Sequence, residues 1–220
     1  MITENLEKIR KELPEHVQLV AVSKTKPIED LQEAFDAGQR IFGENKVQEM
    51  AAKWEMLPKE IEWHFIGHLQ RNKVKYLAPF VSLIHGVESF KLLKEINKQA
   101  LKSNRIIDVL LQFYIADEET KFGLSKEEAE VLLSSEEFKL LQNIRIRGVM
   151  GMATFTKDQE KIRGEFQKLK TIHCDLLKKH FSGVHVFDTV SMGMSGDYSI
   201  AIDEGSTMIR LGSSIFGARN

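Results

Sequence analysis

Short apolar runs alternate with longer amphipathic stretches along the whole chain. The short runs are rich in β-branched residues, as buried parallel strands are, and the longer stretches repeat apolar residues at helical spacing, for example at Phe166, Leu169 and Ile172. The pattern predicts strands near residues 18–23, 41–43, 62–66, 81–86, 106–114, 144–150, 184–190 and 207–211. It predicts helices near residues 3–12, 28–38, 45–57, 70–77, 89–103, 125–136, 157–180 and 197–204.

Eight strand–helix units in a chain of 220 residues predict a (β/α)8 TIM barrel, an α/β fold. The competing doubly wound sheet usually has fewer strands and a glycine-rich phosphate fingerprint after the first of them, which this chain does not have. No stretch rich in proline, glycine and serine divides the sequence. We therefore expect a single domain over residues 1–220.

Composition narrows the class of protein without identifying a function. Hydrophobic residues make up 42% of the chain and charged residues 29%, and the formal net charge is -1, so no general attraction to nucleic acid or to an anionic membrane is expected. The start of the chain does not resemble a signal peptide, and no apolar run is long enough for a membrane helix. The single cysteine, Cys174, suits a reducing compartment. These features predict a cytoplasmic protein.

The first predicted strand ends in a lysine. Val20, Val22 and Lys24 alternate onto one face, so the Lys24 amine is expected at the carboxyl end of the strand, on the buried side. A lysine held in such a place is a candidate nucleophile that can attack a carbonyl to form a Schiff base. This segment alone favours the other interpretation, a lysine that extends outward into solvent.

Small, donor-rich loops follow the last two predicted strands. One contains Ser191, Met194 and Ser195, and the other contains Gly212 and Ser213. Glycines let backbone N–H groups approach an anion, serine hydroxyls add donors, and phosphate sites after strands seven and eight recur in this barrel. Either loop alone would be an ordinary turn. Together, opposite Lys24, the two loops predict a phosphate site that we call the phosphate cup.

Other polar residues at the predicted strand ends have two interpretations each. Arg210, on the face of Met208, needs an acceptor or a stacked ring, and a structural ion pair would satisfy it equally. Asn45 is either a donor to a ligand oxygen or the N-cap of the next helix. His64 and His68 straddle a strand end, where residues four apart do not converge as they do on a helix, so we expect a histidine that stacks on a ring or is held in the core rather than a metal site.

Six sequence blocks occur in order from one end of the chain to the other. They are residues 20–26 (VAVSKTK), 42–49 (FGENKVQE), 63–70 (WHFIGHLQ), 147–154 (RGVMGMAT), 191–195 (SMGMS) and 209–219 (IRLGSSIFGAR). On these blocks the chain resembles the pyridoxal phosphate homeostasis proteins, the YggS/PROSC family. The resemblance implies a barrel like the amino-terminal domain of alanine racemase, the third fold type of proteins that depend on pyridoxal 5′-phosphate (PLP).

The resemblance also implies a cofactor and the residues that hold it. PLP is expected as a Schiff base on Lys24, with Arg210 close to the pyridine nitrogen. The phosphate would be held by the phosphate cup, with Met194 and Ser195 contributing backbone groups. We expect three further residues at the strand ends to contact the cofactor, namely Asn45, His64 and Met152.

The sequence favours cofactor binding over catalytic turnover. An alanine racemase takes an acid–base group from a second domain, whereas this chain ends at Asn220, shortly after the last predicted strand. An arginine at the pyridine nitrogen keeps that nitrogen unprotonated and weakens the ring as an electron sink. The alternatives are a weak PLP-dependent amino acid racemase or lyase, and a barrel enzyme that acts on sugar phosphates through a lysine Schiff base. For the binding function we expect a monomer with apo PLP-dependent enzymes as recipients.

Overall fold

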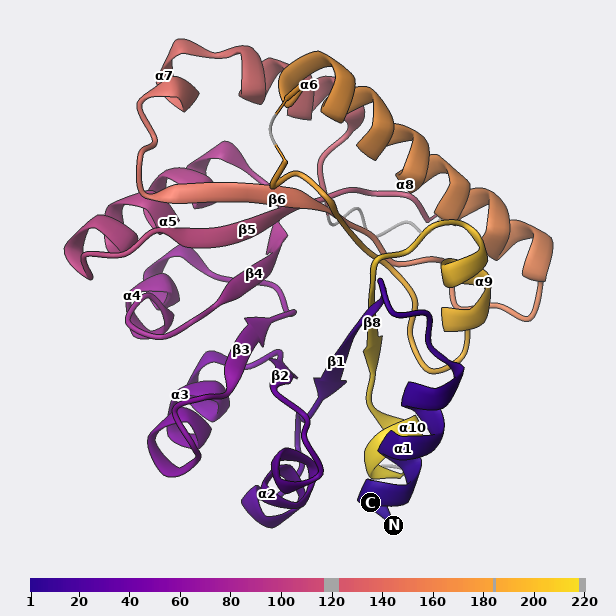
Figure 1. Ribbon diagram of the computed structural model, residues 1–220. Helices are drawn as coiled ribbons and strands as arrows, with labels where there is room; N and C mark the ends of the chain where they lie inside the picture. The colour runs from indigo at the N-terminus through magenta and orange to yellow at the C-terminus, as the bar shows by residue number, and fades with distance from the viewer. Residues whose placement is uncertain (117–122, 184, 218–220) are drawn as a thin grey trace.

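Eight parallel strands form a closed barrel in which each strand pairs with the next and β8 pairs with β1 (Figure 1). The computed structural model describes residues 1–116, 123–183 and 185–217. The strands are β1 (Gln18–Val22), β2 (Ile41–Glu44), β3 (Glu62–Phe65), β4 (Leu83–Val87), β5 (Ile107–Gln112), β6 (Ile144–Met150), β7 (Thr189–Ser191) and β8 (Met208–Leu211). The barrel predicted from the sequence is confirmed.

Helices cover the outside of the barrel (Figure 1). They are α1 (Ile2–Glu12), α2 (Ile28–Asp36), α3 (Val47–Met56), the 3-10 helix η1 (Arg71–Lys73), α4 (Val74–Leu77), α5 (Phe90–Lys102), α6 (Lys126–Ser134), α7 (Glu136–Lys139), α8 (Gln159–His180), α9 (Tyr198–Asp203) and α10 (Ser213–Phe216). Side-chain caps start several of them: Ser125 and Glu128 form a reciprocal capping box at α6, and Asp158 accepts from the Lys161 amide at α8.

Three segments differ from the sequence prediction. The strand expected near residues 184–190 is reduced to β7 at Thr189–Ser191, because Phe187 stacks on Phe181 with ring centroids 4.1 Å apart instead of joining the sheet. The four-residue helices α7 and α10 were not predicted, since one turn of helix has no amphipathic period. Most of the polar loop that follows β5, over residues 118–122, lies outside the described residues.

The core has two parts. A large cluster lies between the barrel and its helices and includes Phe42, Trp63 and Phe166, all fully buried. A smaller cluster lies inside the barrel, and we call it the apolar layer. Its members are Val20, Leu83, Leu110, Met150 and Met208. The carboxyl-terminal half of the interior is polar and is described below.

The two ends of the described chain lie side by side (Figure 1). The Asn5 side-chain amide on α1 donates to the Ile215 carbonyl on α10 at 2.9 Å. Within the described residues, no helix has the length and apolar character needed to cross a membrane.

Candidate functional site

A cavity of about 590 Å³ opens at the carboxyl ends of the strands. Function collects at this end of a TIM barrel, and the volume is in the range of small-molecule sites. Eight of the ten residues that the sequence predicts as cofactor ligands line it: Lys24, Asn45, Met152, Met194, Ser195, Arg210, Gly212 and Ser213. The other two, His64 and Ser191, are buried and are not among the residues that line the cavity.

Lys24 lies two residues after the end of β1 and lines the cavity together with Val22. Val20, on the same face, belongs to the apolar layer below. The alternation along the strand therefore continues from the barrel core to the cavity, as the sequence predicts. A second lysine, Lys26, also lines the cavity, and its Nζ donates to the Phe216 carbonyl at 2.9 Å.

Asn45 lies at the end of β2 and faces the cavity. It is not the N-cap of α3, because Lys46 occupies that position, so this alternative from the sequence is wrong. Gly67 packs tightly behind it: a Cβ atom on Gly67 would lie 2.6 Å from the Asn45 carbonyl oxygen. The close approach of the two loops thus requires glycine at position 67.

The phosphate cup is built by the loop after β7 and the start of α10. Gly193 turns the chain with φ of 97°, and the Gly212 amide points to Ser195 Oγ at 3.4 Å. Asp197 Oδ1 accepts from the Met194 amide at 2.6 Å, so this backbone donor is already used within the loop. Burial raises the pKa of Asp197, and the Arg210 charge opposes that rise. The Gly212 amide is likewise used within the cup, and the hydroxyl-bearing residues that line the cavity here are Ser195 and Ser213.

A chain of buried hydrogen bonds forms the floor of the cavity, and we call it the polar layer. The Arg210 guanidinium donates to Ser191 Oγ and to the Gly151 carbonyl, the latter at 3.1 Å. Ser191 Oγ lies 3.0 Å from His85 Nδ1, and His85 Nε2 lies 3.1 Å from His64 Nδ1. The structural ion pair considered for Arg210 is not observed among the described residues, because its hydrogen bonds go to a hydroxyl and a carbonyl.

The Arg210 guanidinium, at one end of the polar layer, sets the direction of the hydrogen bonds along it. Arginine only donates, so Ser191 accepts from Arg210 and has its own proton free for His85 Nδ1. We therefore assign the His85 proton to Nε2, from which it donates to His64. Burial lowers the pKa of His64 to about 3 and that of His85 well below its ordinary value, so both rings are neutral. Burial also lowers the pKa of Arg210, to about 10, which leaves it charged near neutral pH.

Two of the predicted cofactor ligands belong to the polar layer. The sequence places Ser191 in the phosphate cup and His64 against the cofactor; neither is among the residues that line the cavity, and Ser191 accepts from Arg210. Their contact with the cofactor stays a prediction. His64 is held in the core, as its alternative interpretation states. His85 was missed, although its period-two relation to Leu83 on β4 would have placed a polar side chain inside the barrel.

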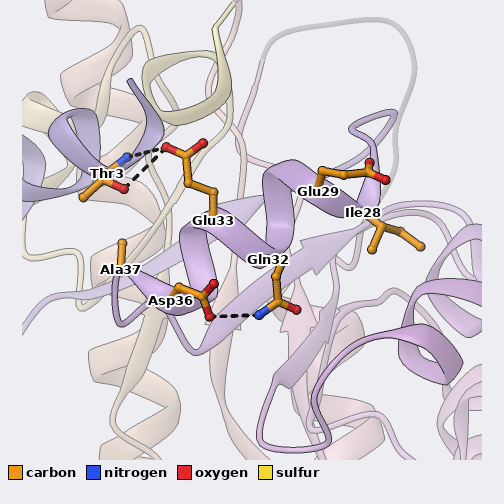
Figure 2. Close-up of a pocket in the computed structure, with 7 residues that line it drawn as sticks. All are labelled: Thr3, Ile28, Glu29, Gln32, Glu33, Asp36 and Ala37. Carbon is orange, nitrogen blue, oxygen red and sulfur yellow. Dashed lines mark hydrogen bonds between the residues drawn. The ribbon is translucent and has the colours of Figure 1, made fainter.

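A second, shallower cavity of about 680 Å³ lies beside α1 and α2, on the outside of the barrel (Figure 2). Its lining includes Glu29, Glu33 and Asp36, and Figure 2 shows the Glu33 carboxylate bonded to Thr3 and the Asp36 carboxylate bonded to Gln32. This negative lining does not suit an anionic ligand. A phosphate compound fits the strand-end cavity instead, which three cationic side chains, Lys24, Lys26 and Arg210, line.

Comparisons with known proteins agree with this geometry. The family model for the alanine racemase N-terminal domain matches residues 1–220. A pyridoxal phosphate homeostasis protein from Vibrio alginolyticus is 40% identical over 212 residues, which is 94% of this chain and 88% of that protein. The corresponding protein of Escherichia coli K12 is 37% identical over the same shares of both chains.

Solved structures give the same result. PipY of Synechococcus elongatus PCC7942, solved with PLP bound, has a TM-score of 0.90 and 34% identity, with 99% of this chain and 100% of that one covered. Its form without PLP has a TM-score of 0.92. Alanine racemase from E. faecalis shares the fold at 18% identity, with a TM-score of 0.75 and coverage of 58% of that chain. The chain belongs to the pyridoxal phosphate homeostasis protein family, whose barrel is that of the alanine racemase N-terminal domain.

Proposed function

We propose that this protein binds PLP in the strand-end cavity, as a Schiff base on Lys24, and serves the intracellular homeostasis of the cofactor. The observation that carries the proposal is the meeting of Lys24, Arg210 and the serine and glycine donors of the phosphate cup in one cavity. The names of the relatives and the PLP-bound PipY structure support it.

The residues of the cavity fit the chemical groups of PLP. Lys24 supplies the amine that condenses with an aldehyde, and PLP when bound supplies that aldehyde. Ser195, in the loop after β7, and Gly212 and Ser213, at the start of α10, supply neutral groups that suit a phosphate. Arg210 lines the cavity, and its hydrogen bonds to Ser191 and Gly151 fix the direction of its guanidinium. The guanidinium is a donor that suits the pyridine nitrogen of PLP, which is an acceptor.

We propose binding rather than catalytic turnover. A racemase or lyase needs placed acid–base groups on the faces of the substrate, each typically contributing about 10²–10⁴-fold. Two tyrosines lie near the strand ends, Tyr114 after β5 and Tyr198 on α9, and neither is among the described residues that line the cavity. The relatives are named as homeostasis proteins, which supports the same conclusion. A cytoplasmic monomer that delivers PLP to apo enzymes is the setting we expect.

A spectroscopic titration tests the proposal. Addition of PLP to the purified protein should produce an absorbance band above about 400 nm that borohydride bleaches, as a lysine Schiff base requires. Pyridoxal without phosphate should bind more weakly because it does not engage the phosphate cup. If the protein gives no such band, yet borohydride reduction fixes a sugar phosphate to it, the sugar phosphate enzyme is the better interpretation.

A turnover assay tests the second part. Holoprotein with L-alanine in deuterated water should exchange the α-proton no faster than about tenfold over free PLP with the same amine, since no tyrosine or histidine is among the described residues that line the cavity. Sustained racemisation of a common amino acid would show that the protein is an amino acid racemase rather than a cofactor-binding protein.

A further inference from the structure

The turn that carries Lys24 is strained. The Lys26 amide donates to the Ser23 carbonyl at 3.0 Å, so Lys24 and Thr25 are the two central residues of a tight turn. Thr25 has φ of 66°, a conformation normally left to glycine at the third position of such a turn and unfavourable for a β-branched residue. A turn of this kind persists only where surrounding contacts hold it.

Those contacts come from one buried lysine on α3. Lys53 Nζ donates to three oxygen atoms, each at 2.8 Å: the Ser23 carbonyl and one carboxylate oxygen of each of Glu44 and Glu49. An ammonium has three protons, so its hydrogen-bonding capacity is used completely.

The two carboxylates extend the network to both neighbours of Lys24. Ser23 Oγ donates to Glu44 Oε1 at 2.7 Å, and the Thr25 amide donates to Glu49 Oε1 at 2.6 Å. Residues 23 and 25 are therefore tied, through Glu44 and Glu49, to the same ammonium. The direction of the Lys24 side chain is set by the backbone between them.

The burial of this network is expensive, which argues that it serves more than packing. The Lys53 side chain is 7% exposed and that of Glu44 is fully buried. Burial raises the pKa of Glu44, while the charge of Lys53 opposes the rise. Apolar residues often replace such buried ion pairs at no loss of stability. Lys53, Glu44 and Glu49 lie behind the loop and are not among the residues that line the cavity.

We propose that Lys53 is a positioning residue that, through Ser23, Glu44 and Glu49, holds the strained turn and so directs the Lys24 amine at the bound carbonyl compound. The inference rests on the proposed function, because it assigns to Lys53 the orientation of the Schiff-base lysine. Orientation of this kind raises the effective concentration of the amine without adding any contact to the ligand.

A comparison of two ligands tests the proposal. PLP uses both the phosphate cup and Lys24, whereas pyridoxamine 5′-phosphate has no aldehyde and uses only the non-covalent contacts. In Lys53→Met, we expect the affinity for PLP to fall by at least about tenfold, with a smaller band above 400 nm, and that for pyridoxamine 5′-phosphate to change by less than about threefold. Leu93→Ala is the control, because Leu93 is fully buried on α5 and its truncation destabilises the protein away from the loop. It should leave the ratio of the two affinities unchanged.

The outcomes separate this proposal from the proposed function. If the wild-type protein forms no borohydride-reducible adduct at Lys24, the proposed function itself fails. If the wild-type adduct forms but Lys53→Met leaves the ratio of affinities as in the wild type, or lowers both affinities equally, Lys53 has only a structural role. Should Lys53→Met not fold, Glu49→Leu decides the matter by the same ratio, since Glu49 is 22% exposed and tolerates replacement more easily.

Discussion

The two halves of the barrel interior are built from the same strands and have opposite chemistry. β4 places Leu83 in the apolar layer and His85 in the polar layer, two residues further on. β8 does the same with Met208 and Arg210. One period of the strand therefore separates a region that stabilises the fold from a region that costs stability.

The two layers differ in their effect on the stability of the fold. The apolar layer gains free energy by removing hydrocarbon from water. The polar layer buries a guanidinium and two imidazoles, and burial lowers the pKa of Arg210 to about 10 and that of His64 to about 3. Every link in the chain from Gly151 to His64 is a hydrogen bond, so the groups are satisfied and fixed in direction. The interior is thus divided between a layer for stability and a layer that aims a donor into the cavity.

The largest expected effect concerns the cavity above the polar layer. Lys24→Ala should abolish the band above 400 nm and all borohydride-stable labelling, because the amine that condenses with PLP is removed. The free energy of unfolding, measured in urea, should change by less than about 1 kcal/mol, since Lys24 lies above both layers. A reducible adduct retained at another lysine would contradict the assignment.

The next effect separates the two layers. Leu110→Ala removes a fully buried side chain from the apolar layer and should lower the free energy of unfolding by about 2–5 kcal/mol. The affinity for PLP in the folded protein should change by less than about threefold, which corresponds to under 1 kcal/mol. Urea denaturation and the spectroscopic titration measure the two quantities. A parallel loss of affinity would show that the layers are coupled.

A smaller effect is expected in the phosphate cup. Ser213→Ala removes one neutral donor to a charged acceptor, worth about 1.5–3 kcal/mol, so the affinity for PLP should fall by roughly one to two orders of magnitude. The affinity for unphosphorylated pyridoxal should stay close to the wild-type value. If both ligands lose affinity equally, the phosphate lies elsewhere. Ser191→Ala is the comparison variant. Ser191 contacts Arg210 and is not among the residues that line the cavity, so its replacement should lower the affinity for both ligands by a similar factor.

The smallest effect is a pH dependence from the polar layer. The folded pKa of His64, about 3, is below its ordinary value of 6.5, so the unfolded chain takes up a proton first as the pH falls. This contribution to stability is complete above pH 6.5 and is lost towards pH 3, with a slope of up to about 1.4 kcal/mol per pH unit. In His64→Gln the free energy of unfolding, measured between pH 7 and pH 5, should fall less steeply. Equal slopes for both proteins would show that His64 does not titrate on unfolding.

The sequence predicted the fold well because the fold depends on periodicity. The alternation of Val20, Val22 and Lys24 placed the lysine on the correct face, and eight strand–helix units gave the barrel. β7 was misplaced because hydrophobicity near Phe187 indicates burial but not whether the residue pairs with a strand or stacks on a ring.

The site was predicted less completely because part of it depends on contacts across the fold. Position at a strand end placed Asn45 and Ser195 in the cavity correctly. It could not show that Ser191 bonds to Arg210 and His85, which come from other strands. The Lys53 network was equally hidden, since it joins α3 to the loop after β1 across about thirty residues.

The most direct test of the account is the identity of the lysine that reacts. The PLP-loaded wild-type protein is reduced with borohydride, digested, and mapped by mass spectrometry. The account predicts one phosphopyridoxyl group per chain, on Lys24, even though Lys26 lines the same cavity. Modification of Lys26 in place of Lys24, or labelling spread over surface lysines, would contradict it.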